Sequence, residues 1–143
     1  MNYRHAFHAG NHADVLKHIV LLMCLDALKR KPAPFAVLDT HAGCGAYDLL
    51  SDEALRSPEW QDGIARLWEW ADAPAPVMRY LAAVRAFNGD GALRNYPGSP
   101  ALIAAALRRP SDARGRPTFV RPVRNPCCPV MNDARPAVQL CSA

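Results

Sequence analysis

The chain lacks a long apolar segment, and its start lacks the charged and then apolar pattern of a leader. No apolar stretch reaches the roughly 18 residues that a helix needs to span a bilayer. The first residues are polar and rich in histidine, unlike a secretory signal peptide. These absences predict a soluble protein of the cytoplasm with no membrane partner. Half of the 143 residues are apolar, which is enough for the core of one small domain.

Two common metal-binding motifs are also missing. The five cysteines form no Cys-x-x-Cys pair, and an odd number of cysteines without a framework fits a reducing compartment. No His-Glu-x-x-His pattern occurs, and Gly10 interrupts the pair at helical spacing, His8 and His12. We therefore expect no metal site, and a histidine-rich, metal-dependent hydrolase is only a third hypothesis for the function.

The net charge of +4 does not by itself indicate a nucleic-acid-binding surface. Residues 1–110 contain 12 Lys and Arg against 11 Asp and Glu, whereas residues 111–143 contain 5 against 2. The positive excess therefore lies mainly in the last quarter of the chain. Residues 110–143 also hold 6 of the 13 prolines and show neither alternation nor a helical period. This composition predicts an irregular tail over residues 111–143.

What the sequence does contain is a histidine-rich segment, residues 3–18, that continues into a helix. It holds four of the five histidines, namely His5, His8, His12 and His18. Imidazole titrates near neutral pH and can donate or accept a hydrogen bond. The segment therefore indicates a functional loop fixed to a rigid element, and scattered polar residues with structural partners are the alternative.

The helix after this segment has clear start and stop signals. Asn11 can cap it, with Asp14 at a capping-box position. Basic residues around Arg30 suit its C-terminal end, and Pro32 stops it. Apolar residues occupy more than one side of the helix, so we expect it to be well buried.

Residues 35–39 form a short apolar run that ends in Asp39 and predicts a buried parallel strand. Gly43 and Gly45 follow in a tight loop, where a glycine lets the backbone approach a ligand closely. Ligands of open α/β sheets bind outside the carboxyl ends of the strands, which is where this loop would lie. The fifth histidine, His41, belongs to this loop.

Residues 46–96 are expected to be helical throughout. Ser57 can cap one helix, whose tryptophan stripe we assign to the core, and Pro76 can start another. Ser99 then reads as the cap of a last helix that ends at Pro110, with Pro100 in its first turn.

Three blocks occur in order along the chain: residues 3–18, Leu38-Asp39-Thr40-His41-Ala42-Gly43 and Tyr96-Pro97-Gly98-Ser99-Pro100. Together and at this spacing they resemble the RlmJ family, the bacterial large-subunit ribosomal RNA adenine-N6 methyltransferases that use S-adenosylmethionine. The resemblance covers roughly residues 1–110.

The resemblance implies an α/β, Rossmann-like methyltransferase fold that is incomplete here. Residues 1–45 and 97–110 would form the N-terminal part of the methyltransferase domain, and residues 46–96 a helical insertion. By the same resemblance, the cofactor S-adenosylmethionine is approached by Lys17, His18, His41 and Ser99. Tyr3 is implied to contact the RNA substrate, which is 23S ribosomal RNA.

The family's Asp-Pro-Pro-Tyr motif is absent from these 143 residues. In the family, its Asp and a backbone carbonyl accept hydrogen bonds from the target amine, while its Tyr stacks on the flipped base. We therefore assign no catalytic residue and expect an inactive, truncated or frameshifted form, with a frameshift near residues 110–115. The alternative is a non-catalytic fragment that binds RNA or a partner.

Overall fold

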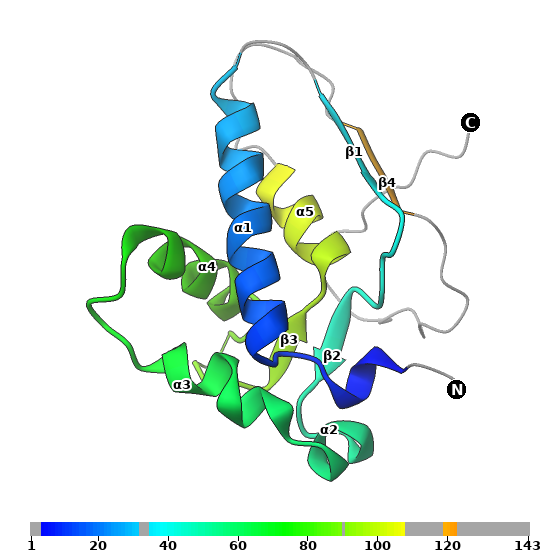
Figure 1. Cartoon of the computed structure of the whole chain (residues 1–143), viewed down its shortest axis with the longest axis vertical. Coiled ribbons are helices and arrows are strands. Elements are labelled where there is room, and N and C mark those ends of the chain that lie inside the picture. The colour runs from blue at the N-terminus through cyan, green and yellow to red at the C-terminus, as the bar shows by residue number, and fades with distance from the viewer. Residues whose placement is uncertain (1–3, 32–34, 90, 108–118, 123–143) are drawn as a thin grey trace.

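The computed structural model describes residues 4–31, 35–89, 91–107 and 119–122, the last four through their backbone alone. Helices and strands are mixed along the chain (Figure 1). The elements are η1 His5–Phe7, α1 His12–Lys29, β1 Ala36–Asp39, β2 Ala46–Asp48, α2 Asp52–Arg56, η2 Glu59–Asp62, α3 Ile64–Trp68, α4 Ala75–Arg85, β3 Asn95–Pro97, α5 Ser99–Leu107 and β4 Phe119–Pro122.

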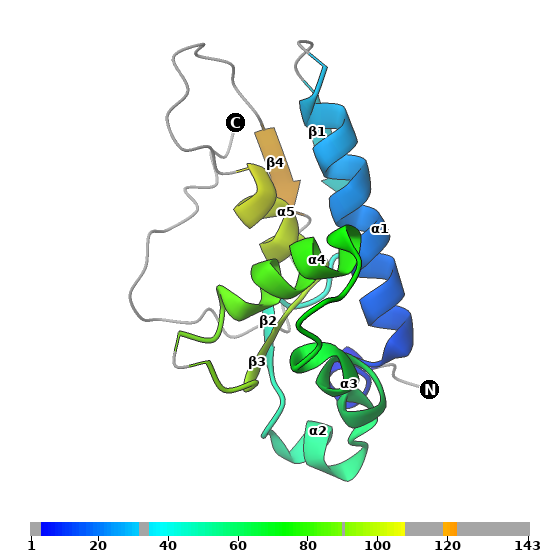
Figure 2. The same cartoon turned by 90° about the vertical axis from the view of Figure 1, so that its left-hand side faces the viewer.

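The long helix α1 begins where the sequence predicts. The side chain of Asn11 accepts a hydrogen bond from the backbone N–H of Asp14 at 2.9 Å, which satisfies one of the free donors of the first turn. The helix packs against α4 and α5 (Figures 1 and 2). Among the described helices, none is both long and apolar enough to cross a membrane.

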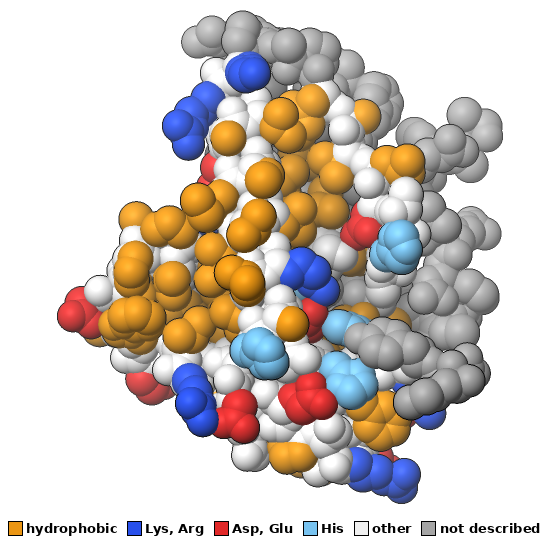
Figure 3. Space-filling model, in the orientation of Figure 1, with side chains coloured by type: hydrophobic (Ala, Val, Ile, Leu, Met, Phe, Trp, Pro, Cys, Tyr) orange, Lys and Arg blue, Asp and Glu red, His pale blue; other side chains and the backbone are white. Residues whose placement is uncertain are grey.

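The expectation that α1 is well buried is wrong for one of its sides. Leu22 and Leu25 are buried under α4 and α5, but Leu16 is 66% exposed and Met23 is 51% exposed. The helical period places residues 16, 20 and 23 opposite residues 18, 22 and 25, and the described elements cover only the second side. Figure 3 shows the resulting band of apolar side chains over α1.

The predicted strand is confirmed as β1, but the expectation that it is buried is wrong, because Ala36 is exposed and Leu38 is 66% exposed. β1 also has a partner that the sequence does not predict. β4 pairs with β1 in parallel, with Ala36 opposite Phe119 and Asp39 opposite Pro122. Parallel strands need a crossover between them, and α5, which lies between β1 and β4 in the chain, contacts both strands. The remainder of the predicted irregular tail lies outside the described residues.

The prediction of helix throughout residues 46–96 is wrong at both ends of that range. There β2 and β3 form an antiparallel pair, with Tyr47 opposite Tyr96. Burial alternates along this segment, because Tyr47 and Leu49 are buried while Asp48 is exposed. An alternation of three or four residues was too short to be recognised in the sequence.

The helix predicted from Ser57 is broken into two short pieces, η2 and α3, by Gly63. A Cβ atom at Gly63 would lie 2.0 Å from the carbonyl oxygen of Gly10. The backbone N–H of Ile64 donates to that same oxygen at 2.9 Å. Gly10 itself has a φ of 80°, a conformation that favours glycine. This glycine contact therefore sets the short helices η2 and α3 directly against the loop that precedes α1.

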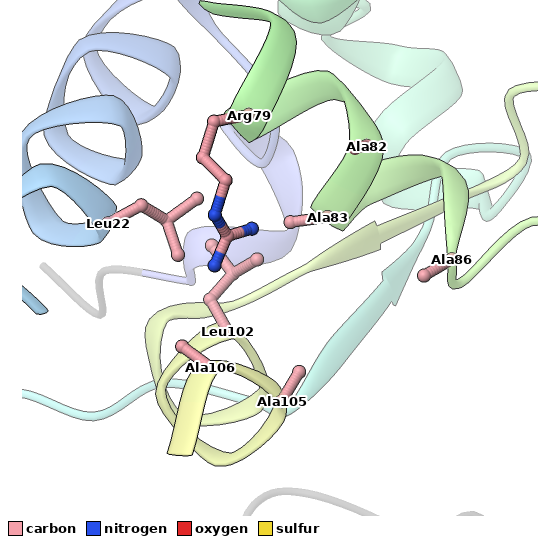
Figure 4. A pocket seen from close by; sticks show the side chains of 8 residues that line it. All are labelled: Leu22, Arg79, Ala82, Ala83, Ala86, Leu102, Ala105 and Ala106. Carbon is pink, nitrogen blue, oxygen red and sulfur yellow. The ribbon is translucent and has the colours of Figure 1, made fainter. Parts of the chain in front are cut away.

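The helix predicted from Pro76 is confirmed as α4, where Pro76 lies in the first turn. Its buried side chains Tyr80, Leu81 and Val84 join the core beside Leu22 of α1. A cleft remains between α1, α4 and α5 (Figure 4), and it is lined mainly by alanines together with Leu22 and Leu102. Arg79, the charged residue of this cleft, donates to Asp26 of α1 at 3.1 Å.

We predict that Gly63→Ala lowers the free energy of unfolding by about 2–4 kcal/mol, because the added methyl group forces two backbone segments apart. Urea denaturation followed by circular dichroism measures this. Gly89→Ala is the matched control, since a Cβ at Gly89 meets nothing within 4 Å. Equal stabilities of the two variants would contradict the close approach of Gly63 to Gly10.

Candidate functional site

A buried carboxylate, Asp14, organises the start of the site. Its side chain is 3% exposed. One carboxylate oxygen accepts from the backbone N–H of Gly10 at 3.0 Å and lies 2.8 Å from Nε2 of His5. The other oxygen accepts from the ammonium of Lys17 at 2.6 Å. Three groups from one short stretch of chain thus meet on a single side chain.

The electrostatics of Asp14 follow from these partners. Burial by itself raises the pKa of the carboxyl group, but the hydrogen bonds from His5 and Lys17 and the backbone bond from Gly10 outweigh it. The net effect holds the pKa of Asp14 well below its ordinary value, so the group is a carboxylate at neutral pH.

A second carboxylate, Glu59 of η2, holds the same segment from the other side. It accepts from the side-chain amide of Asn11 at 2.9 Å, and its other oxygen lies 2.8 Å from Nδ1 of His8. These two hydrogen bonds lower the pKa of Glu59, and the bond from Asn11 has the larger effect. Figure 3 shows histidine and acidic side chains gathered on this face.

The described histidines are distributed over separate partners. His5 contacts Asp14 and His8 contacts Glu59, so each of these two rings is oriented by its own carboxylate. Within the described part of the chain, no three His, Cys, Asp or Glu side chains are grouped so that they could hold a metal ion.

His18 lies one turn further along α1 and is 1% exposed. Its Nδ1 is 2.9 Å from the hydroxyl of Tyr96, and the two rings stack with centroids 5.6 Å apart. The hydroxyl of Tyr80 in α4 is in turn 3.1 Å from that of Tyr96. The second ring nitrogen of His18, Nε2, is buried and has no hydrogen-bond partner among the described residues.

Burial lowers the pKa of His18 to about 4, and the nearby charge of Asp14, which opposes this change, is too weak to offset it. The ring is therefore neutral at pH 7 and carries one N–H. The negative charge of Asp39, at the carboxyl end of β1, also opposes the lowering of the pKa of His18.

At the carboxyl end of β1, Asp39 joins two of the predicted cofactor residues. One carboxylate oxygen accepts from the hydroxyl of Ser99 at 2.6 Å, and the other accepts from the backbone N–H of His41 at 3.1 Å. The exposed ring of His41 is oriented by Thr40, whose hydroxyl is 2.9 Å from Nδ1. A strand end, a loop and a helix start thus meet at one carboxylate.

The interpretation of Ser99 as a helix cap is wrong. The carbonyl of Gly98 accepts from the N–H groups of Ala101 and Leu102, so Gly98 occupies the position before the first turn. Ser99 instead lies inside the first turn, and its hydroxyl donates a charge-assisted hydrogen bond to Asp39.

Residues 96–99 connect the two halves of the site. Tyr96 bonds to His18, and three residues later Ser99 bonds to Asp39. Between them, the N–H of Gly98 donates to the carbonyl of Gly45 at 3.0 Å. A Cβ at Gly98 would lie 2.1 Å from the carbonyl oxygen of Cys44, so only glycine permits this approach of the two loops.

The structure therefore holds His18, His41 and Ser99 through one connected set of contacts. Lys17 is more than half exposed and is directed to Asp14. Tyr3 lies outside the described residues. Sequence reasoning missed the roles of Asp39 and of the two buried tyrosines, although Asp39 and Tyr96 stand inside the blocks that carried the resemblance.

Comparison with known proteins gives the family. Residues 32–117 match the family model described as "Ribosomal RNA large subunit methyltransferase D, RlmJ". The chain therefore belongs to this family of methyltransferases, as the three sequence blocks predicted.

Particular relatives agree with this assignment. The chain is 53% identical over 113 residues to ribosomal RNA large subunit methyltransferase J of Escherichia coli (strain K12), and this alignment covers 79% of the chain. It is 50% identical over 113 residues to the protein of the same name from Haemophilus influenzae, which covers 78%. The alignments cover 40% of each relative, so the chain spans about two fifths of the length of the curated relatives it matches.

A solved structure has a similar fold. The crystal structure of protein LPL1258 from Legionella pneumophila str. Philadelphia 1 superposes with a TM-score of 0.65 at 30% sequence identity. The match covers 78% of this chain and 48% of that chain. Together with the mixed helices and strands of the described residues, it supports an α/β fold.

We predict a pH dependence of stability that comes from His18. The unfolded ring titrates near 6.5 and the folded ring near 4, so between these values the unfolded state binds more protons. Stability is therefore lost as the pH falls from 6.5 to 4, by roughly 3 kcal/mol from this group. Asp14, whose pKa is lowered, adds its own loss only below about pH 4.

Urea denaturation at pH 7, 5.5 and 4.5 measures this effect. His18→Gln is expected to reduce the change in the free energy of unfolding between these pH values. His12→Gln is the matched control, because His12 is exposed at the start of the same helix. An equal pH dependence of the free energy of unfolding in all three proteins would contradict a buried, neutral His18.

Proposed function

We propose that this chain carries the cofactor-side residues of an S-adenosylmethionine-dependent methyltransferase that acts on adenine N6 of 23S ribosomal RNA in the cytoplasm. The observation that carries the proposal is that residues of the three sequence blocks contact one another in the structure. Residues 96–99 contact His18 from the first block and Asp39 from the second. Both named relatives are ribosomal RNA large subunit methyltransferases.

The fold implied by this proposal is Rossmann-like. Two features support it: β1 and β4 are parallel with α5 between them in the chain, and the polar groups lie after the carboxyl end of β1. In this proposal residues 1–45 and 97–110 belong to the methyltransferase domain. Residues 46–96 form an insertion, and residues 111–143 are the tail, in which β4 lies.

The residues of the site fit the cofactor chemically. S-adenosylmethionine supplies an activated methyl group on a positively charged sulfur, and it carries a carboxylate, an amino group and ribose hydroxyls. His41 and Ser99 would hold its polar groups beside Asp39, and the buried Nε2 of His18 needs a hydrogen-bond partner of the kind those groups offer. Lys17 would contribute positive charge from α1, and Tyr3 would contact the RNA.

The chemistry of transfer sets a different requirement. The exocyclic amine of adenine is a poor nucleophile, because its lone pair is conjugated with the ring. It needs acceptors for its hydrogen atoms, which the family's Asp-Pro-Pro-Tyr motif provides and these 143 residues lack. We propose that these residues by themselves bind without transferring methyl groups, which is the behaviour of a non-catalytic RNA- or partner-binding fragment.

Calorimetric titration with S-adenosylmethionine tests the site. We predict binding at least about ten-fold weaker than by the full-length Escherichia coli relative, which corresponds to roughly 1.4 kcal/mol. Ser99→Ala and His41→Ala should each weaken the remaining binding further, by about three- to ten-fold. His12→Ala, an exposed histidine replaced on α1, serves as the control and should leave the affinity unchanged.

Two outcomes would count against the proposal. One is an affinity of the chain equal to that of the full-length relative. The other is an affinity that Ser99→Ala and His41→Ala leave as it was. Incorporation of labelled methyl groups into 23S ribosomal RNA by this chain alone would contradict the proposed lack of transfer.

A further inference from the structure

Three buried side chains from three different elements form one line of hydrogen bonds. Tyr80 of α4 is 3.1 Å from Tyr96 of β3, which is 2.9 Å from Nδ1 of His18 in α1. Tyr80 and Tyr96 are 0% exposed and His18 is 1% exposed. The two hydroxyls are closed off from solvent, so the hydrogen atoms between them and Nδ1 must come from the three groups themselves.

Two arrangements of the hydrogen atoms let Tyr96 accept one hydrogen bond and donate the other, whereas a third, in which Tyr96 accepts both, leaves its own buried O–H unpaired. Each tyrosine has one O–H and a neutral imidazole has one N–H. In the first arrangement Tyr80 donates to Tyr96 and Tyr96 donates to Nδ1, so the ring hydrogen lies on Nε2. In the second arrangement Nδ1–H donates to Tyr96 and Tyr96 donates to Tyr80.

The two arrangements leave different groups unpaired. The first leaves only Nε2–H without a partner among the described residues. The second leaves both the hydrogen of Tyr80 and the lone pair of Nε2 unpaired. Each buried polar group without a partner is unfavourable, and an unpaired donor is among the rarest, so the first arrangement is the more stable one.

We propose that Tyr96, itself oriented by Tyr80, is a positioning residue that fixes His18 in the tautomer with its hydrogen on Nε2. His18 then offers a hydrogen-bond donor, and the ligand group that it meets must be an acceptor oxygen. This deepens the proposed function and rests on it, because the ligand is taken to be S-adenosylmethionine, whose carboxylate and ribose oxygens are such acceptors.

The same line of hydrogen bonds gives the helical insertion a role at the site. Tyr80 is part of α4, whereas His18 is part of α1, and Tyr96 connects them from β3. The stacked rings of His18 and Tyr96 restrict rotation of the imidazole as well. α4 thus contributes one group, the Tyr80 hydroxyl, to the line of hydrogen bonds that ends at His18.

The tautomer can be measured without any ligand. Nitrogen NMR of the chain with labelled histidine distinguishes a ring nitrogen that carries hydrogen from one that does not. At pH 7 we expect the hydrogen of His18 on Nε2, in the unsubstituted chain and in Tyr80→Phe alike. In Tyr96→Phe we expect the Nδ1 signal to move and both tautomers to be populated.

Three results would overturn the proposal. The first is a hydrogen on Nδ1 in the unsubstituted chain, a result that holds even if a variant fails to fold. The second is a switch of tautomer in Tyr80→Phe, which only the second arrangement predicts. The third is an unchanged pair of ring signals in Tyr96→Phe.

A binding experiment tests the link to the ligand. Tyr96→Phe should weaken S-adenosylmethionine about three- to ten-fold, whereas Tyr80→Phe should change it less than about two-fold. Equal affinities of Tyr96→Phe and the unsubstituted chain would overturn the link. If the unsubstituted chain does not bind S-adenosylmethionine at all, the proposed function fails, and the NMR result still decides which tautomer the tyrosines impose.

Discussion

The buried carboxylate of Asp14 is the constraint on which the rest of the structure depends. A carboxylate removed from water is strongly unfavourable unless donors replace the lost solvent. Here the donors come from His5, Gly10 and Lys17, so the histidine-rich segment is held in one conformation against α1. With Gly10 fixed in this way, its carbonyl is directed at the N–H of Ile64, and the start of α3 is held against this segment.

A second constraint acts on the other side of the site. The stretch from Tyr96 to Ser99 passes between α1 and the loop after β1, and glycine at position 98 is what permits the close approach. Tyr96 bonds to His18, and Ser99, three residues later, bonds to Asp39. One short segment therefore contacts both predicted halves of the cofactor site.

The features that sequence predicts correctly here are those written in a few consecutive residues. Asn11 with Asp14, Pro76 in a first turn, and the apolar run before Asp39 each act within one turn or one strand. The features it missed depend on residues far apart in the chain. β2 needs β3 about 50 residues later, and the partner of Ser99 is 60 residues away.

The candidate site likewise contains residues that the sequence predicts and residues that only the structure shows. Resemblance to a family indicated His18, His41 and Ser99, but it gave no reason for their orientation. That reason lies in Asp39, Tyr80 and Tyr96, whose partners are set by tertiary packing and leave no local pattern in the sequence. Similarly, composition alone could not show which side of α1 is covered, since both sides carry apolar residues.

In the proposed function, binding and methyl transfer place separable demands on this chain. The side chains of His18, His41 and Ser99 each have a hydrogen-bond partner within the described residues, namely Tyr96, Thr40 and Asp39. Transfer also needs acceptors for the target amine, arranged on the opposite side of the methyl group from the sulfur. No arrangement of the cofactor-side residues can replace those acceptors, because in-line displacement fixes the nucleophile and the leaving group on opposite sides. The proposed cofactor site is therefore compatible with a chain that transfers nothing by itself.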